Sequence, residues 1–178
     1  MPTAHVFIAA SLDGFIARAD GDISWLVARD DATEDHGYLA FIADKDMIVM
    51  GRGTYEKALT FGEWPYDLPV LVLSRLLADA PVPDALKYKV RFSSCTPQET
   101  MDELATKGVR RIYVDGGQLV QSFLREGLIT DMVITQVPVL IGSGKPLFGM
   151  LPQDIDLKLV SSISFPSGLV QSCYRVSQ

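Results

Sequence analysis

Two adjacent glycines, Gly116 and Gly117, stand between an apolar run at 111–115 that predicts a buried strand and a segment that predicts an amphipathic helix. Glycine lets the backbone take a positive φ and lets a ligand come close. The first N–H groups of the following helix carry the positive end of its dipole. This turn can therefore hold a phosphate group, although a tight strand-to-helix corner without a ligand would give the same pattern.

Two arginines follow two further apolar runs. Arg52 lies in the turn GRGT at 51–54, and Arg75 lies in the pair SR at 74–75. A guanidinium group is a planar, permanently charged fork that suits a 2′-phosphate, so the pair favours NADP over NAD. The alternative is that both are surface arginines paired with Asp or Glu.

The segments that carry these residues belong to an alternation of predicted strands and helices. Strands are expected at 6–10, 15–17, 47–50, 70–73, 89–92, 111–115 and 132–137, and helices within 32–43, through 55–59, from 97 to about 108, and after 117. Thr96, Pro97 and Glu99 predict a capping box at the start of the third helix. The segment 142–146 is expected to be an exposed, mobile loop. The alternating segments 157–165 and 170–176 predict a terminal antiparallel hairpin.

This order of elements predicts a three-layer α/β fold. It would have a mostly parallel mixed sheet, helices on both faces and the C-terminal hairpin as an antiparallel edge. With 178 residues, 48% of them hydrophobic, residues 1–178 are expected to form a single domain. Ligands of such folds bind at the carboxyl ends of the strands, which is where the glycines and arginines lie.

Charge and composition exclude several kinds of partner. The net charge of −6 argues against nucleic acid and against an anionic membrane surface. The apolar runs are of strand length and no leader is recognisable, so we expect a cytoplasmic protein without a membrane span. The two cysteines and two histidines stand alone in the sequence, and we expect no metal site.

Four segments together resemble the dihydrofolate reductase superfamily: IAASLDGFIA at 8–17, VMGRGTYE at 49–56, VLSR at 72–75 and VDGGQLV at 114–120. They are still more similar to the reductase domain of the bifunctional deaminase-reductase of riboflavin biosynthesis, whose marks are SLDG at 11–14 and PVLIG at 138–142. The resemblance implies a dihydrofolate reductase-like fold and an NADPH-dependent reductase that acts as a homodimer without metal or flavin.

The same resemblance implies the contacts to the cofactor. Ala10 and Ile16 would flank the nicotinamide. The remaining contacts would be Gly51, Arg52 and Thr54 to the 2′-phosphate and pyrophosphate, Leu73, Ser74 and Arg75 to the adenosine side, and Gly116, Gly117, Gln118, Leu119 and Val120 to the pyrophosphate and nicotinamide ribose.

The substrate would be a small planar heterocycle of pteridine or pyrimidine type, such as 5-amino-6-(5-phosphoribosylamino)uracil. Asp13, Trp25 and Thr135 are expected to face it. Dihydrofolate reductases carry an acid five residues beyond a tryptophan to help protonate the pterin. Asp30 has this spacing from Trp25, with Thr135 as its expected partner, and is the candidate catalytic acid; a solvated loop carboxylate or a helix N-cap would explain Asp30 equally well.

Two departures from the riboflavin-type pattern affect the choice of substrate. The sequence TYEKA at 54–58 replaces a stretch of the form TVLxDxP, and Asp115 replaces a glutamate before the two glycines. Dihydrofolate reductase activity, and a protein that binds NADPH or another nucleotide without chemistry, are therefore kept as alternatives.

Overall fold

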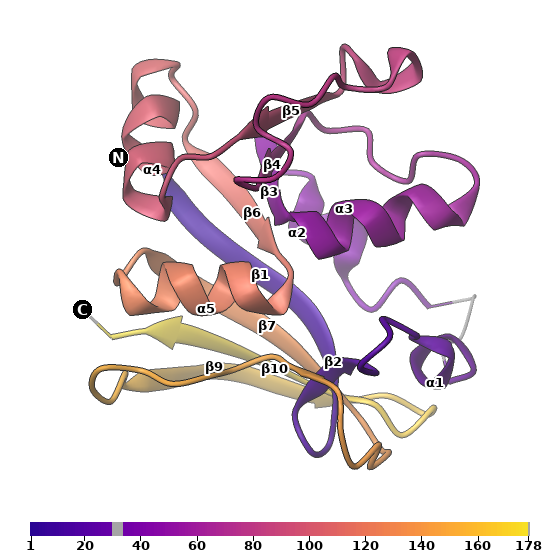
Figure 1. Ribbon diagram of the computed structural model, residues 1–178. Helices are drawn as coiled ribbons and strands as arrows, with labels where there is room; N and C mark the ends of the chain where they lie inside the picture. Colours follow the sequence, from indigo (N-terminus) through magenta and orange to yellow (C-terminus); the bar gives the residue numbers. More distant parts are fainter. Residues whose placement is uncertain (30–33, 178) are drawn as a thin grey trace.

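A computed structural model of the protein describes residues 1–29 and 34–177. Its middle layer is an eight-stranded sheet with the order β5-β4-β3-β6-β1-β7-β10-β9 (Figure 1). The strands are β1 (Thr3–Ser11), β3 (Met47–Gly51), β4 (Val70–Leu73), β5 (Val90–Ser93), β6 (Arg111–Asp115), β7 (Ile129–Val137), β9 (Leu157–Ser164) and β10 (Val170–Val176).

Strands β5, β4, β3, β6, β1 and β7 run parallel, whereas β10 pairs antiparallel with β7 and β9 pairs antiparallel with β10. The parallel strands are apolar on both faces because helices cover both, and Val49, Val72 and Val114 have no exposed surface. The predicted mostly parallel sheet with a C-terminal hairpin is confirmed.

Helices lie on both faces of the sheet. Helices α4 (Pro97–Thr106) and α5 (Gly117–Arg125) pack Met101, Leu104 and Phe123 into one core. Helices α2 (Tyr38–Ile42) and α3 (Arg52–Ala58) contribute to the second core, in which Tyr55 is buried. Helix α1 (Ser24–Val27) and the 3₁₀ turns η1 (Leu59–Phe61) and η2 (Asp84–Leu86) complete the elements outside the strands. The three layers predicted from the sequence are confirmed.

The helix expected within 32–43 is found as α2, which covers Tyr38–Ile42. Helix α2 begins at Tyr38, because Gly37 has a left-handed φ of 81°. The side chain of Asp35 accepts hydrogen bonds from the backbone N–H groups of Gly37 and Leu39 and fixes this start. Residues 32 and 33 lie outside the described residues.

The loop expected at 142–146 is exposed at Gly142, Ser143, Lys145 and Pro146, and its mobility stays a prediction. Lys145–Pro146 forms strand β8, which pairs antiparallel with β2 (Phe15–Ala17) in a separate two-stranded sheet. The backbone of Gly144 approaches the carbonyl oxygen of Ala17 so closely that no Cβ would fit. A two-residue strand has no periodicity of its own, so this pairing leaves no mark on the sequence.

No helix among the described residues is both long enough and apolar enough to cross a membrane.

Candidate functional site

Three strand ends that the sequence marked separately meet at one edge of the sheet. Strands β4, β3 and β6 are direct neighbours, and the register places Gly51 beside Leu73 and Met50 beside Asp115. All three strands run parallel, so their carboxyl ends open in the same direction. The segments 51–54, 73–75 and 115–117 therefore form one candidate site, at the edge where α/β folds bind ligands.

The turn at Gly116 requires glycine for two reasons. Its φ of 97° is a conformation that side chains rarely allow. A Cβ on Gly116 would stand 2.5 Å from Oγ1 of Thr54, which is too close for any side chain. The turn after β6 and the first turn of α3 are thus in contact.

The second glycine faces the small sheet formed by β2 and β8. A Cβ on Gly117 would stand 2.7 Å from the carbonyl oxygen of Pro146 and 3.0 Å from Cδ1 of Ile16. Nε2 of Gln121 donates to the same carbonyl oxygen at 3.1 Å. Ala10, the other residue expected at the nicotinamide, is 3% exposed on neighbouring strand β1.

Among the described residues, no side chain caps the first turn of helix α5. Gly116 is its N-cap and supplies no side chain to cap it. The N–H groups of Gly117, Gln118 and Leu119 therefore have no acceptor within the helix. Gln118 is exposed, whereas Leu119 and Val120 point into the core, so only their backbone could meet a ligand.

The side chains of Arg52 and Arg75 differ in their ion pairing. The guanidinium of Arg52 forms a 2.8 Å ion pair with Glu56 one turn along α3, and both side chains are about half exposed. Arg75 is exposed and has no ion pair with the residues that the structure describes. Ser74, beside it, accepts a hydrogen bond from the backbone N–H of Leu77 at 3.3 Å. A phosphate at Arg52 would thus share the guanidinium with Glu56, whereas Arg75 is available.

Asp13, expected to face the substrate, holds two loops together. Its carboxylate accepts hydrogen bonds from Oγ of Ser11 at 2.6 Å and from the backbone N–H groups of Ile141 and Gly142. The Ser11 hydrogen bond is the main cause that holds the pKa of Asp13 below its ordinary value. This carboxylate ties the turn after β1 to the segment that leads into β8.

Trp25 and Thr135 are both buried, at 4% exposure each. The indole N–H of Trp25 has no acceptor among the described residues. Oγ1 of Thr135 accepts a 3.0 Å hydrogen bond from Nε2 of Gln171, which also donates to the carbonyl oxygen of His36. The candidate acid Asp30 lies outside the described residues, so its predicted pairing with Thr135 stays a prediction.

In the sequence, Asp115 stands out only as a departure from a family pattern. Its burial and its tyrosine neighbours were not predicted. The residue ends β6 directly before Gly116, and burial raises the pKa of its carboxyl group to about 6. The hydroxyls of Tyr113 and Tyr66 lower the pKa of this carboxyl group and so offset part of the effect of burial. An acidic residue at the end of an apolar strand was the available signal, whereas nothing in the sequence linked Tyr66 to it.

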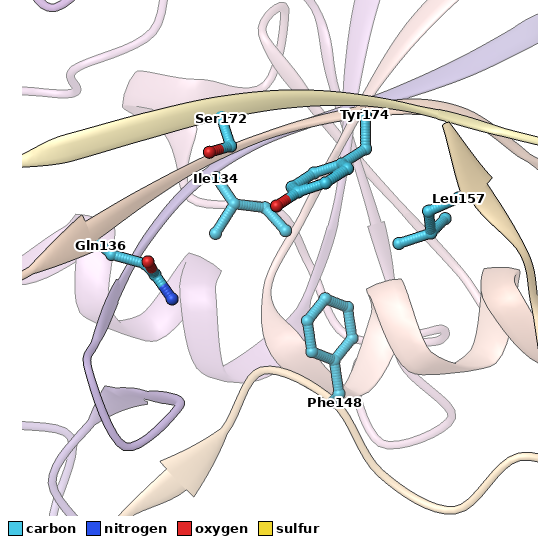
Figure 2. Close-up of a pocket in the computed structure, with 6 residues that line it drawn as sticks. All are labelled: Ile134, Gln136, Phe148, Leu157, Ser172 and Tyr174. Atoms are coloured by element: carbon cyan, nitrogen blue, oxygen red, sulfur yellow. The ribbon is translucent and has the colours of Figure 1, made fainter. Parts of the chain in front are cut away.

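A separate pocket of about 260 Å³ lies on the outer part of the sheet. Figure 2 shows Phe148 across the hollow from Ile134, Ser172 and Tyr174 on strands β7 and β10. Gln136 and Leu157 complete its lining, and it contains none of the residues predicted to bind cofactor. Within residues 1–29 and 34–177, no three His, Cys, Asp or Glu side chains gather as a metal site.

The sequence matches the RibD C-terminal domain over residues 2–171. The chain belongs to the RibD C-terminal domain family. This is the reductase-like family of riboflavin biosynthesis, and it supports an oxidoreductase with a dihydrofolate reductase-like fold.

Three relatives show how this chain sits in the family. It is similar to the uncharacterized protein YwjB of Bacillus subtilis, with 34% identity over 165 residues and 90% of each chain covered. A solved putative riboflavin biosynthesis protein from Shewanella sp. PV-4 is 37% identical, covers 99% of both chains and has a TM-score of 0.92. The fold is also that of a diaminohydroxyphosphoribosylaminopyrimidine deaminase/5-amino-6-(5-phosphoribosylamino)uracil reductase from Thermotoga maritima. The TM-score is 0.76 at 16% identity, and the match covers 99% of this chain and 57% of that chain.

Proposed function

We propose that this protein is an NADPH-dependent reductase of a small heterocyclic substrate of pyrimidine or pteridine type. One observation carries the proposal: the uncapped N-terminus of α5 lies against Thr54 of α3, at an edge where three parallel strands end. Backbone donors at a helix N-terminus favour an anion, and the two glycines let this turn pack directly against Thr54 and Pro146.

The residues present fit a dinucleotide phosphate. The N–H groups at 117–119 would bind the pyrophosphate together with the Thr54 hydroxyl, and Arg75, with Arg52, would bind the 2′-phosphate. Ile16 and Ala10 would bound the nicotinamide on the side of β2 and β1. Bound NADPH would supply the hydride, while the chain places the two reactants and excludes water from between them.

The substrate proposal rests on family membership and on the buried indole of Trp25. Trp25 offers an indole N–H without an acceptor among the described residues, and a buried donor of this kind is costly unless a ligand or water satisfies it. A uracil or pterin ring carries carbonyl groups that would accept it. 5-Amino-6-(5-phosphoribosylamino)uracil is therefore the first substrate to test, followed by dihydrofolate.

The test is calorimetric titration of the purified protein with NADPH and, separately, with NADH. We expect NADPH to bind at least about ten-fold more tightly, a difference of about 1.4 kcal/mol or more. The Arg52→Ala/Arg75→Ala double variant should lose this preference. An Arg110→Ala/Arg125→Ala double variant removes the same charge from exposed positions away from the three strand ends and should keep it.

The outcomes distinguish a reductase from a nucleotide-binding protein without catalytic activity. Binding of NADPH followed by loss of its absorbance with the uracil substrate supports the reductase. Binding without turnover of any pyrimidine or pterin supports a nucleotide-binding protein without chemistry. Absence of binding by either dinucleotide contradicts the proposal.

We also propose a homodimer that forms through the hairpin surface, defined here as Phe148, Leu157, Leu159 and Val170. Between 37% and 54% of each of these apolar residues is exposed, and Phe148 and Leu157 line the pocket of Figure 2. Strand β9 forms one edge of the sheet and all of its residues are exposed. Proteins protect such apolar edges, and a second copy of the chain would cover this one.

A further inference from the structure

Strands β1 and β7 continue past the end of β6 at the edge of the sheet that carries the candidate site. The register pairs His5 of β1 with Tyr113 of β6, and β6 ends two residues later. Thr135 of β7 pairs with Ala9, which lies four residues beyond His5 on β1. Each residue advances a strand by about 3.3 Å, so Thr135 lies roughly two residues beyond the end of β6. Its side chain therefore belongs to the carboxyl-end edge of the sheet.

Thr135 is held by a side chain of the neighbouring strand. Gln171 of β10 pairs directly with Thr135, and its Nε2 donates to Oγ1 of Thr135 at 3.0 Å. The same nitrogen donates to the carbonyl oxygen of His36, two residues before α2, at 2.9 Å. A backbone carbonyl oxygen can only accept, so the nitrogen of the amide must face it. Gln171 thus uses both of its N–H bonds, and the reversed orientation of its amide is excluded.

The Gln171 amide determines what Thr135 can offer to a ligand. Because Oγ1 of Thr135 accepts from Gln171, the hydroxyl proton must point away from that amide. Thr135 is 4% exposed, and the described residues supply no acceptor for this proton. A buried donor without an acceptor is costly, and a ligand with a carbonyl group at this position would satisfy it.

We propose that Gln171 is a positioning residue that makes Thr135 a hydrogen-bond donor to the substrate. The inference rests on the proposed reductase function, in which Thr135 faces the substrate. A site of this polarity selects a heterocycle with a ring carbonyl, such as a uracil or a 4-oxopteridine. An amino group in the same place would leave the Thr135 proton without an acceptor.

The protein without ligand tests the hydrogen bonds themselves. In ¹⁵N-labelled protein, the side-chain NH₂ signals of Gln171 are those that disappear in Gln171→Glu. The two protons bind different acceptors, so we expect two separate signals that exchange slowly with water. Thr135→Val removes one acceptor and should shift one of the two signals, whereas Thr135→Ser keeps the hydroxyl and should keep both. If Thr135→Val changes neither signal, the amide does not hold Thr135 and the inference is overturned.

The second test compares two heterocycles that share one ring. The first is 5,6-diaminouracil, and the second is 2,4,5,6-tetraaminopyrimidine, in which amino groups replace both carbonyls. Calorimetry measures the Kd of each for the protein saturated with NADP⁺, at a pH where both heterocycles are uncharged. The wild type should bind the uracil about ten-fold or more tightly than the tetraamine. Thr135→Val should lose this preference, and Thr135→Ser should keep it.

Gln171→Glu should reverse the preference. A carboxylate has no proton to donate, so it accepts the Thr135 hydroxyl proton and leaves the lone pairs of Oγ1 for the ligand. The tetraamine should then bind more tightly than the uracil, while the Kd for NADPH stays the same. Gln153→Glu introduces the same charge at an exposed position, and this matched control should keep the wild-type preference. Should Gln171→Glu not fold, Gln171→Met decides, because it frees the hydroxyl without adding a charge and should abolish the preference.

The outcomes separate this inference from the proposed function. If the wild-type protein does not bind NADPH, the reductase proposal fails and the inference fails with it. If NADPH binds and the wild type prefers the tetraamine, binds both heterocycles alike or binds neither, only the inference is overturned. The same holds if the Gln171 variants keep the wild-type preference, or weaken both heterocycles equally as a purely structural role would.

Discussion

The carbonyl oxygen of Pro146 stands 2.7 Å from the place that a Cβ on Gly117 would occupy. This relationship joins two parts of the chain that the sequence kept apart: the turn that starts α5 and the short strand β8. The same carbonyl accepts the side-chain amide of Gln121 at 3.1 Å. The first turn of α5 and β8 are thus fitted to each other with no space for a methyl group.

Gly117→Ala should therefore both destabilise the protein and weaken cofactor binding. The added methyl must displace the backbone at Pro146, and overpacking of this kind costs roughly 1–3 kcal/mol. Because the displaced segment borders the proposed pyrophosphate site, we expect the Kd for NADPH to rise about ten-fold or more. Urea unfolding measures the first effect and calorimetry the second.

Gly53→Ala is the matched control for stability. Gly53 lies within α3, and a Cβ there meets nothing within 4 Å. Since alanine favours helix over glycine by up to about 1 kcal/mol, this variant should be as stable as the wild type or more stable. Equal destabilisation by the two substitutions would contradict the steric explanation for Gly117.

Asp13 should give the protein a stability that depends on pH. Hydrogen bonds from Ser11, Gly142 and Ile141 lower the pKa of its carboxyl group in the folded protein below the ordinary 3.8. A group with a depressed folded pKa stabilises the fold fully above its unfolded pKa, and this contribution disappears as the pH falls through the folded pKa. The Tm difference between wild type and Asp13→Asn should thus be largest at neutral pH and shrink in acid.

Thermal unfolding at a series of pH values measures this difference. Asp154→Asn, at an exposed position, should show no such trend. A constant Tm difference for Asp13→Asn down to about pH 2 would show that the carboxylate charge is not what holds the two loops together.

The capping box of α4 gives a prediction in a part of the molecule remote from the site. Oγ1 of Thr96 accepts from the N–H of Glu99 at 3.2 Å, and the Glu99 carboxylate accepts from the N–H of Thr96 at 2.8 Å. Thr96→Ala removes the first bond and should cost about 1 kcal/mol in the free energy of unfolding. Thr106→Ala, at the other end of α4, should cost less, because alanine is the better helix former and no cap is lost.

Local sequence patterns sufficed for the strands of the main sheet and for helices α3, α4 and α5, but not for α1 or β8. The capping box at Thr96 was predicted because its two bonds span three residues. The turns at Gly51 and Gly116 were predicted because apolar runs stop directly before them. Each of these features is decided within a few neighbouring positions, where propensity and periodicity act.

Relationships across the chain were not accessible in this way. The order β4-β3-β6 brings Gly51 and Asp115 together, but it depends on which crossovers the helices make. The pairing of Lys145–Pro146 with β2 involves too few residues for a pattern. The Tyr66 hydroxyl influences the pKa of the Asp115 carboxyl group, which lies 49 positions later in the chain. A tyrosine in a polar loop gives no indication of such a partner.

The hairpin surface leads to a prediction about assembly. If Phe148, Leu157, Leu159 and Val170 form the dimer interface, a charge at Leu159, which is 54% exposed on the edge strand, should be buried without a partner in the dimer. An unpaired buried charge is costly, so Leu159→Asp should convert a dimer to a monomer while the subunit keeps its fold. Light scattering with size-exclusion chromatography measures the mass, and circular dichroism measures the fold.

Tyr88→Asp is the matched control and should leave the dimer intact. Tyr88 is 90% exposed and lies next to β5, at the opposite edge of the sheet. A monomeric wild type, or a dimer that Leu159→Asp does not change, would contradict an interface at this surface.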